Sequence, residues 1–204
     1  MGNTRTTAGD FPAFRIEAGI APRLQDAAAG LYLRHFGAQV LPFPVPAARA
    51  ERFIRAAMQP RMVLAALDGG GGLIGLLGLR DAGGGFLGMT ADARAALGAF
   101  AGVTGALMPL FRPGPATADM VIDGLAIADR WQRRGVGRAL LAHALADAAR
   151  RGYPGLRAEV ALRNRAALRF YEAAGFSPQG SHRIGWPWSA SWLGRAAVMR
   201  RDVP

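Results

Sequence analysis

The segment DRWQRRGVGRALLAHALADAARRG, residues 129–152, predicts a short turn followed by a long amphipathic helix. Gly135 and Gly137 stand at the start of this helix, where the first-turn N–H groups have no acceptor within the helix. Those groups and the positive end of the helix dipole favour a bound anion, and glycine lets a ligand approach the backbone closely. The turn therefore predicts a diphosphate site, although its arginines equally suit a nucleic-acid surface.

Composition predicts one folded domain. The chain has 204 residues, of which 51% are hydrophobic, and its 25 basic residues are all arginine, for a net charge of +11. Because the arginines are scattered from Arg5 to Arg201, charge alone does not distinguish nucleic acid, an anionic membrane or a phosphorylated small molecule as the partner. The sequence has no cysteine, no apolar run long enough to cross a membrane and no secretory signal near its start. We therefore expect a cytoplasmic protein without membrane association or thiol catalysis.

Hydrophobic periodicity predicts an α/β fold with the order β-α-α-β-β, an insertion, and then β-α-β-α-β-β. The expected strands are residues 13–18, 61–67, 73–80, 120–127 and 156–162, with two more within 181–201, and the expected helices are 21–37, 47–58, 135–152 and 164–175. Asp68–Gly72 predicts a hairpin turn between the second and third strands. The insertion, residues 83–115, is apolar and partly helical, and it suits a pocket cover, a subunit contact or core filling.

The segment from residue 120 to residue 176 resembles the GNAT acetyltransferase superfamily, and its core motifs are nearest to the N-terminal alanine acetylases that modify ribosomal proteins. Two motifs carry the resemblance: the pyrophosphate signature Gln132-x-x-Gly135-x-Gly137, and, in the next strand–helix unit, Asn164, Ala167, Tyr171 and Gly175-Phe176. The resemblance implies a single N-acetyltransferase domain over residues 1–204. It also implies a mixed, mostly antiparallel central sheet flanked by helices, with a helical insertion before the fourth strand. A Rossmann unit fits less well, because the third glycine and the acidic ribose partner are missing.

The resemblance further implies acetyl-CoA as the donor, and no motif suggests a metal. The pantetheine arm would pair with the backbone of Leu125, Ala126 and Ile127 as if it were an added strand. The pyrophosphate would lie on the amides that follow Gln132, which are those of Arg133, Arg134, Gly135, Val136, Gly137 and Arg138. Asn164 would contact the arm, and Tyr171, two helical turns further on, would point its hydroxyl at the thioester sulfur.

Acetyl transfer to an amine needs a base for the amine proton and an acid for the leaving thiolate. Tyr171 is the candidate acid. Glu159 is the favoured base, since its setting resembles that of the base in the alanine acetylases, and Asp123 on the neighbouring strand is the alternative. Either carboxylate can instead form an ion pair with an arginine such as Arg157 or Arg169.

Two other functions stay open: a basic protein that binds nucleic acid or an acidic partner, and a family member that binds CoA without catalysis. Nucleic acid is the less favoured partner, because the common nucleic-acid motifs are missing and the tryptophans lie away from the densest arginine pairs. The insertion and the loop with Trp186, Trp188 and Trp192 are apolar. We therefore expect a bulky or partly hydrophobic primary amine, either a small molecule or a peptide N-terminus, as acceptor. The same apolar segments suit a homodimer.

Overall fold

The computed structural model describes residues 13–41, 45–98, 102, 117–183 and 194–203. Its strands are β1 (Phe14–Ala18), β2 (Val63–Asp68), β3 (Leu73–Asp81), β4 (Gly84–Gly85), β5 (Met120–Ile127), β6 (Gly155–Ala161), β7 (Ser177–Arg183) and β8 (Arg195–Asp202). Its α-helices are α1 (Gln25–Val40), α2 (Ala47–Ala57), α3 (Ala91–Leu97), α5 (Val136–Arg150) and α6 (Arg165–Ala173). Short 3-10 helices are η1 (Pro22–Leu24), η2 (Pro60–Met62) and η4 (Asp129–Trp131). The order of helices and strands agrees with the prediction.

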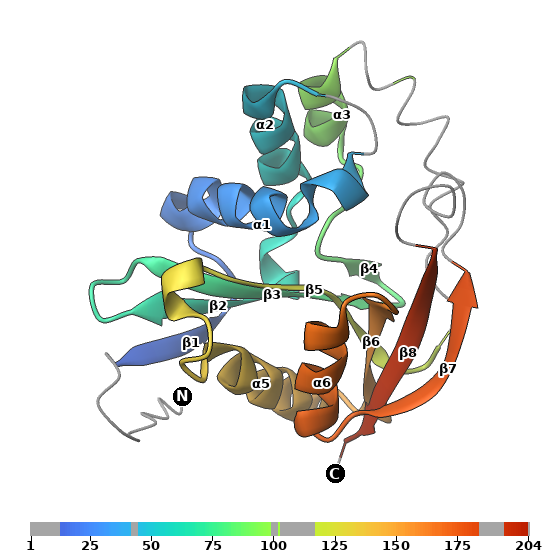
Figure 1. Ribbon diagram of the computed structural model, residues 1–204. Coiled ribbons are helices and arrows are strands. Elements are labelled where there is room, and N and C mark those ends of the chain that lie inside the picture. The colour runs from blue at the N-terminus through green and yellow to red at the C-terminus, as the bar shows by residue number, and fades with distance from the viewer. Residues whose placement is uncertain (1–12, 42–44, 99–101, 103–116, 184–193, 204) are drawn as a thin grey trace.

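The described strands form one eight-stranded sheet in the order β1-β2-β3-β5-β6-β8-β7, with β4 paired to β3. β5 and β6 run parallel, and the other described pairs run antiparallel. Helices α1 and α2 cover one face of the sheet, and α5 and α6 cover the other (Figure 1). The sheet is therefore mixed and mostly antiparallel, as the resemblance implies.

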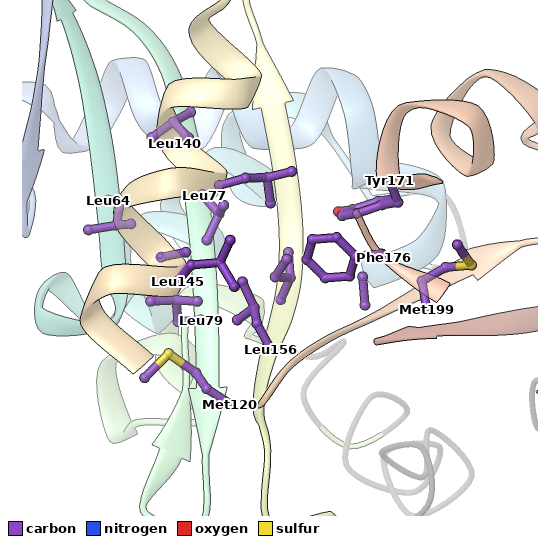
Figure 2. Close-up of a cluster of buried hydrophobic side chains, with 14 of the residues drawn as sticks. Leu64, Leu77, Leu79, Met120, Leu140, Leu145, Leu156, Tyr171, Phe176 and Met199 are labelled. Carbon is purple, nitrogen blue, oxygen red and sulfur yellow. The ribbon is translucent and has the colours of Figure 1, made fainter. Parts of the chain in front are cut away.

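Two apolar cores hold the helices on the sheet. The first lies under α5 and α6 and includes the side chains of Figure 2. The second lies under α1, α2 and α3, around the fully buried Phe86 and Leu31. Burial of one such large side chain contributes about 1.5–3 kcal/mol. The apolar stripe predicted on α5 is buried in the first core: Val136, Leu140, Leu141, Ala144, Leu145 and Ala148.

Local turn chemistry gives one confirmation and one correction. In the β2–β3 turn, Oδ1 of Asp68 accepts the N–H groups of Gly70 at 3.0 Å and Gly72 at 2.8 Å, so the predicted hairpin is confirmed. The predicted end of the first helix at Gly37 is wrong, because α1 continues to Val40. A helical glycine costs only about 1 kcal/mol, and burial of Leu41 in the second core offsets this cost.

The structure describes part of the predicted insertion. β4 lies in it, and so does α3, which begins where the Thr90 hydroxyl accepts the N–H of Ala93 at 3.0 Å. α3 packs on α2. Residues 99–101 and 103–116 lie outside the described residues, as do Trp186, Trp188 and Trp192. The roles expected for the insertion and for the tryptophan loop therefore stay predictions.

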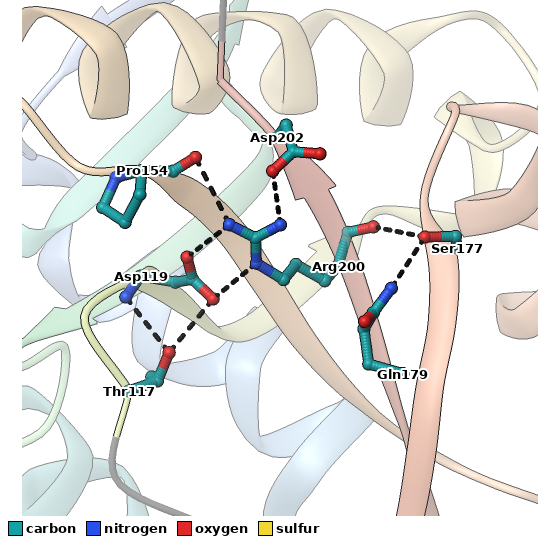
Figure 3. Close-up of polar contacts among 7 residues, drawn as sticks. All are labelled: Thr117, Asp119, Pro154, Ser177, Gln179, Arg200 and Asp202. Carbon is teal, nitrogen blue, oxygen red and sulfur yellow. Dashed lines mark hydrogen bonds and ion pairs between the residues drawn. The ribbon is translucent and has the colours of Figure 1, made fainter.

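A polar network joins the residues before β5 to β8 (Figure 3). Asp119 is 8% exposed and accepts two hydrogen bonds from Arg200, at 2.9 Å from Nε to Oδ2 and 3.1 Å from Nη2 to Oδ1. The Thr117 hydroxyl donates to Oδ2 at 3.0 Å, and the Pro154 carbonyl accepts from Arg200 at 3.4 Å. A bidentate pair of this kind is strong and directional. It fixes the start of β5 against β6 and β8.

Gly155, the first residue of β6, leaves no room for a side chain beside that ion pair. A Cβ there would lie 2.6 Å from Oδ1 of Asp119 and 2.7 Å from Nη2 of Arg200. We expect Gly155→Ala to lower the free energy of unfolding in urea by about 1–3 kcal/mol, because the pair must move apart. The control is Gly69→Ala, whose Cβ would meet nothing nearer than the Ala13 carbonyl at 3.9 Å. Equal stability of the two variants would contradict this packing argument.

Candidate active site

β5 and β6 form a fork in the middle of the sheet. Their parallel pairing joins Met120 to Leu156 and ends with Ile122 opposite Ala158. Beyond that point β5 stays paired with β3 and β6 stays paired with β8, but the described residues show no further pairing of β5 with β6. On the side of β6, the edge of β5 at residues 125–127 therefore has no paired strand among the described residues. Its backbone groups there are open to an extended partner.

A β-bulge lies at the base of the fork. Gly78 of β3 pairs with Gly124, and the next residue, Leu79, pairs with Ile122, so Asp123 is the extra residue. A Cβ on Gly124 would lie 3.1 Å from ring carbons of both Tyr32 and Phe36 on α1. Bulges re-aim side chains. This one turns Asp123 toward the face covered by α1, where Arg80 and the Phe86 N–H contact it.

The turn before α5 presents unpaired amides. Arg133 and Gly135 are both left-handed, with φ of 58° and 81°. The first hydrogen bond of the helix runs from the Ala139 N–H to the Gly135 carbonyl at 3.0 Å, and no side chain caps Gly135. The N–H groups of residues 135–138 therefore lack helical acceptors, which is the arrangement that an anion site needs.

Side chains around this turn hold its shape. Gln132 Nε2 donates to the Ile127 carbonyl at 3.3 Å and to Oδ1 of Asp129 at 3.1 Å, which ties the turn to the end of β5. The guanidinium of Arg134 lies 5.9 Å from the centre of the Trp131 ring, and Arg138 donates to the Ala173 carbonyl of α6 at 3.2 Å.

The two signature glycines differ in their surroundings. A Cβ on Gly137 would lie 3.2 Å from the Phe170 ring, so this glycine permits close packing of α5 on α6. A Cβ on Gly135 would meet nothing within 4 Å. Gly135 thus faces open space, and its left-handed backbone is the feature that favours glycine there.

Helix α6 carries the two candidate residues of the second motif. Asn164 caps the helix, since its Oδ1 accepts the Ala167 N–H at 3.1 Å, as the sequence predicted. Tyr171 is 6% exposed and packs between Phe170 and Phe176, with ring centres 5.4 and 5.2 Å away. Figure 2 shows Tyr171 beside Phe176 in the core under α5 and α6. Burial raises the pKa of the Tyr171 hydroxyl well above its ordinary value, so the hydroxyl stays protonated.

The two candidate bases stand opposite each other at the fork. Asp123 and Glu159 each follow the last residue through which β5 and β6 pair with each other. The negative charge of Glu159 contributes to the raised pKa of Asp123. Ala158 and Val160 face the core under α5 and α6, so Glu159 points to the other face, as Asp123 does. Tyr171 therefore lies on one face of the sheet and the carboxylates lie on the other.

Each carboxylate has an arginine partner. Arg80 Nε donates to Oδ1 of Asp123 at 2.8 Å, and Arg157 Nη2 donates to Oε1 of Glu159 at 3.0 Å. The expected pairing with Arg157 is therefore confirmed for Glu159, whereas the expected alternative, Arg169, is an exposed residue of α6. Burial raises the pKa of Asp123; Arg80 and the Phe86 N–H oppose the rise, and Glu159 adds to it.

Several residues of this cluster were missed from the sequence. His182 Nε2 lies 3.1 Å from Oε2 of Glu159, and Arg80, Tyr32 and Phe36 border Asp123 and the bulge. They come from β7, β3 and α1, so no local motif joins them to the fork. Within the described ranges, no group of three or more acidic, histidine or cysteine side chains is arranged to hold a metal, and no helix is long and apolar enough to cross a membrane.

The sequence matches the model of one protein family. The family model described as "Acetyltransferase (GNAT) family" matches residues 32–176, so the chain belongs to this family. A curated relative, the [ribosomal protein bS18]-alanine N-acetyltransferase of Escherichia coli K12, is 38% identical over 63 residues. That match covers 31% of this chain and 43% of the relative's length.

Solved structures agree with this fold. The ribosomal-protein-S18-alanine N-acetyltransferase of E. coli is 19% identical, with a TM-score of 0.57 over 93% of this chain and 94% of its own. A GCN5-related N-acetyltransferase from Kribbella flavida is 18% identical, with a TM-score of 0.60 over 93% of this chain and 97% of its own. At such identities the likeness concerns the fold alone.

Proposed function

We propose that the protein is an acetyl-CoA-dependent N-acetyltransferase that moves the acetyl group to a primary amine by direct attack on the thioester. The observation that carries this proposal is the fork. It joins the uncapped amides at the start of α5 to a carboxylate pair on the α1 side, and Tyr171 lies between the α6 helix and the sheet. A donor threaded through the fork would meet an acceptor at Asp123 and Glu159.

Acetyl-CoA fits the donor half of this arrangement. The amides of residues 133–138 would hold the pyrophosphate, helped by the left-handed turn at Arg133 and Gly135. The pantetheine arm would pair with the backbone of Leu125, Ala126 and Ile127, along the part of the β5 edge that does not pair with β6. Asn164 would contact the same arm. Bound there, acetyl-CoA supplies an activated acyl thioester at the fork.

The chain's own residues would supply the proton transfers. Glu159 would accept the proton of the attacking amine, directly or through water. Tyr171 would donate its proton to the sulfur of the leaving group, and its raised pKa keeps it in the donating form. Asp123, desolvated and bonded to Arg80, would add negative charge near the developing cation.

The acceptor side favours a particular class of amine. Arg80 and Arg157 offset the charges of Asp123 and Glu159, so the cluster has no excess negative charge to attract a polycation. Tyr32 and Phe36 border the same face with aromatic surface. These contacts support a bulky or partly hydrophobic primary amine, and the name of the E. coli relative supports a peptide N-terminus in particular.

The two other functions predict different behaviour. A nucleic-acid binder would bind with strong salt dependence, yet Arg134 and Arg138, in the densest arginine stretch, lie against Trp131 and Ala173 of the protein itself. A CoA-binding member without catalysis would bind acetyl-CoA but acetylate no amine. The homodimer stays a prediction.

Calorimetric titration of acetyl-CoA tests the donor site. We expect Gly135→Trp to weaken acetyl-CoA binding about 10- to 100-fold. The tryptophan side chain would fill the open space in front of the amides and so prevent their hydrogen bonds to the charged pyrophosphate. The control is Gly152→Trp at the far end of α5. Gly152 has a similar φ of 74°, against 81° at Gly135, and equally open surroundings.

Gly152→Trp should bind acetyl-CoA as the wild type does, so any loss common to both variants would reflect backbone strain and not the phosphate site. A folded wild-type protein that binds neither acetyl-CoA nor CoA would overturn the proposal. A salt-dependent nucleic-acid binding assay would then be the next experiment.

A further inference from the structure

We propose that His182 is a positioning residue, which holds the Glu159 carboxylate in place for proton transfer. The inference rests on the proposed function. His182 lies on β7 at the edge of the sheet, and β8 separates it from β6. Neither the turn before α5 nor the α6 motif includes it, and the sequence alone gives no reason to connect it with Glu159.

The contact geometry carries the proposal. His182 Nε2 lies 3.1 Å from Oε2 of Glu159, and Arg157 Nη2 lies 3.0 Å from Oε1. The carboxylate is therefore held on both oxygens, from β7 on one side and from its own strand on the other. A carboxylate has about four lone-pair sites. Two donors leave acceptor capacity on each oxygen, so Glu159 is fixed in orientation and still able to take a proton.

The other ring nitrogen indicates the tautomer. Nδ1 of His182 is buried and has no hydrogen-bond partner among the described residues. A buried N–H without an acceptor is costly, whereas a bare acceptor nitrogen is tolerated better. The proton therefore sits on Nε2, where it donates to Glu159. In this tautomer His182 donates a hydrogen bond from Nε2, and its ring orientation is set by the carboxylate it holds.

The consequence for the reaction is geometric. The Glu159 side chain is 23% exposed, and with Oε2 released its carboxyl group could rotate about its side-chain bonds. A small displacement of a catalytic group costs a large factor in rate. His182 thus acts through Glu159.

The tautomer can be measured without any acceptor substrate. The sequence contains three histidines, so nitrogen-15 NMR of histidine-labelled protein is assigned with the His182→Gln variant. We expect the pattern of a ring protonated on Nε2 and bare on Nδ1, and a changed Nε2 shift in Glu159→Gln. A ring protonated on Nδ1, or Nε2 shifts that ignore Glu159→Gln, would overturn the proposal whether or not the protein is an acetyltransferase.

Kinetics then test the role. We expect His182→Ala to lower kcat about tenfold or more with the Kd for acetyl-CoA unchanged. His182→Gln, which keeps a side-chain N–H donor, should recover most of that loss. His143→Ala is the matched control: His143 lies on α5, where its Nδ1 is 3.0 Å from the Ala139 carbonyl, and its loss should leave kcat unchanged.

A double-mutant cycle separates positioning from general damage. If His182 works only through Glu159, adding His182→Ala to Glu159→Gln costs nothing further. An undiminished loss in the double variant, or no rescue by His182→Gln, would overturn the positioning role. Calorimetry distinguishes failure of the proposed function from failure of this inference. Wild-type protein that binds no acetyl-CoA would overturn the acetyltransferase function, whereas the NMR result tests the contact between His182 and Glu159 in either case.

Discussion

Glu159→Gln is expected to lower kcat by about 10²- to 10⁴-fold, the range typical of a lost general base, while the Kd for acetyl-CoA stays near the wild-type value. The substitution keeps the size of the side chain and one oxygen, which can still accept from Arg157 or His182. It removes the charge and basicity that draw the proton from the attacking amine. Removal of that charge also lowers the pKa of Asp123, since Glu159 contributes to its rise.

The measurement is steady-state acetylation of a primary-amine acceptor, a peptide N-terminus first, with thiol release as the readout. Asp123→Asn is the matched control, because it is also isosteric and also lies opposite an arginine at the fork. We expect it to cost about tenfold or less, through a weaker electrostatic effect. A greater loss in Asp123→Asn than in Glu159→Gln would reassign the base to Asp123.

Elements coded by local patterns were well predicted from the sequence. The bounds of β5 agree with the prediction, because eight consecutive residues with few breakers make an unambiguous buried strand. The start of α5 and the Asn164 cap follow from glycine and asparagine chemistry within a few residues. The donor half of the candidate site was therefore visible, since it is built from one contiguous strand–turn–helix segment.

The sequence pointed to the two carboxylates of the acceptor half but not to their contacts, because those contacts depend on register. One extra residue in β5 turns Asp123 to the α1 face, and the end of pairing at Ile122 opens the fork. Neither feature has a sequence signature of its own. His182 meets Glu159 only because β8 pairs with both β6 and β7 and so holds β7 one strand away from β6. No local motif in the sequence connects His182 with Glu159, and the sheet order brings the two within contact.

Tyr171→Phe is the second variant with a large expected effect: we expect kcat to fall by about 10²- to 10³-fold, with acetyl-CoA binding and stability nearly unchanged. The ring packs between Phe170 and Phe176 and stays in place in the variant. Its hydroxyl has no hydrogen bond to the described residues, so its loss leaves no buried partner unsatisfied. In the proposed mechanism, only the proton for the leaving sulfur is lost.

Tyr153→Phe is the matched control, because it removes a hydroxyl that has a structural hydrogen bond and lies away from the fork. The Tyr153 hydroxyl donates to Oδ2 of Asp81 at 3.0 Å, beside Arg151 at the far end of α5. We expect that variant to lower the free energy of unfolding by about 1 kcal/mol and to leave kcat unchanged.

The pH profile gives an independent check on Tyr171. Burial raises its pKa above the ordinary value near 10, so its proton is lost only at a pH higher still. Tyr171 therefore stays protonated throughout the working range, and wild-type kcat should show no decline from tyrosine ionisation up to about pH 10. A Tyr171→Phe variant with wild-type kcat would exclude Tyr171 as the proposed acid.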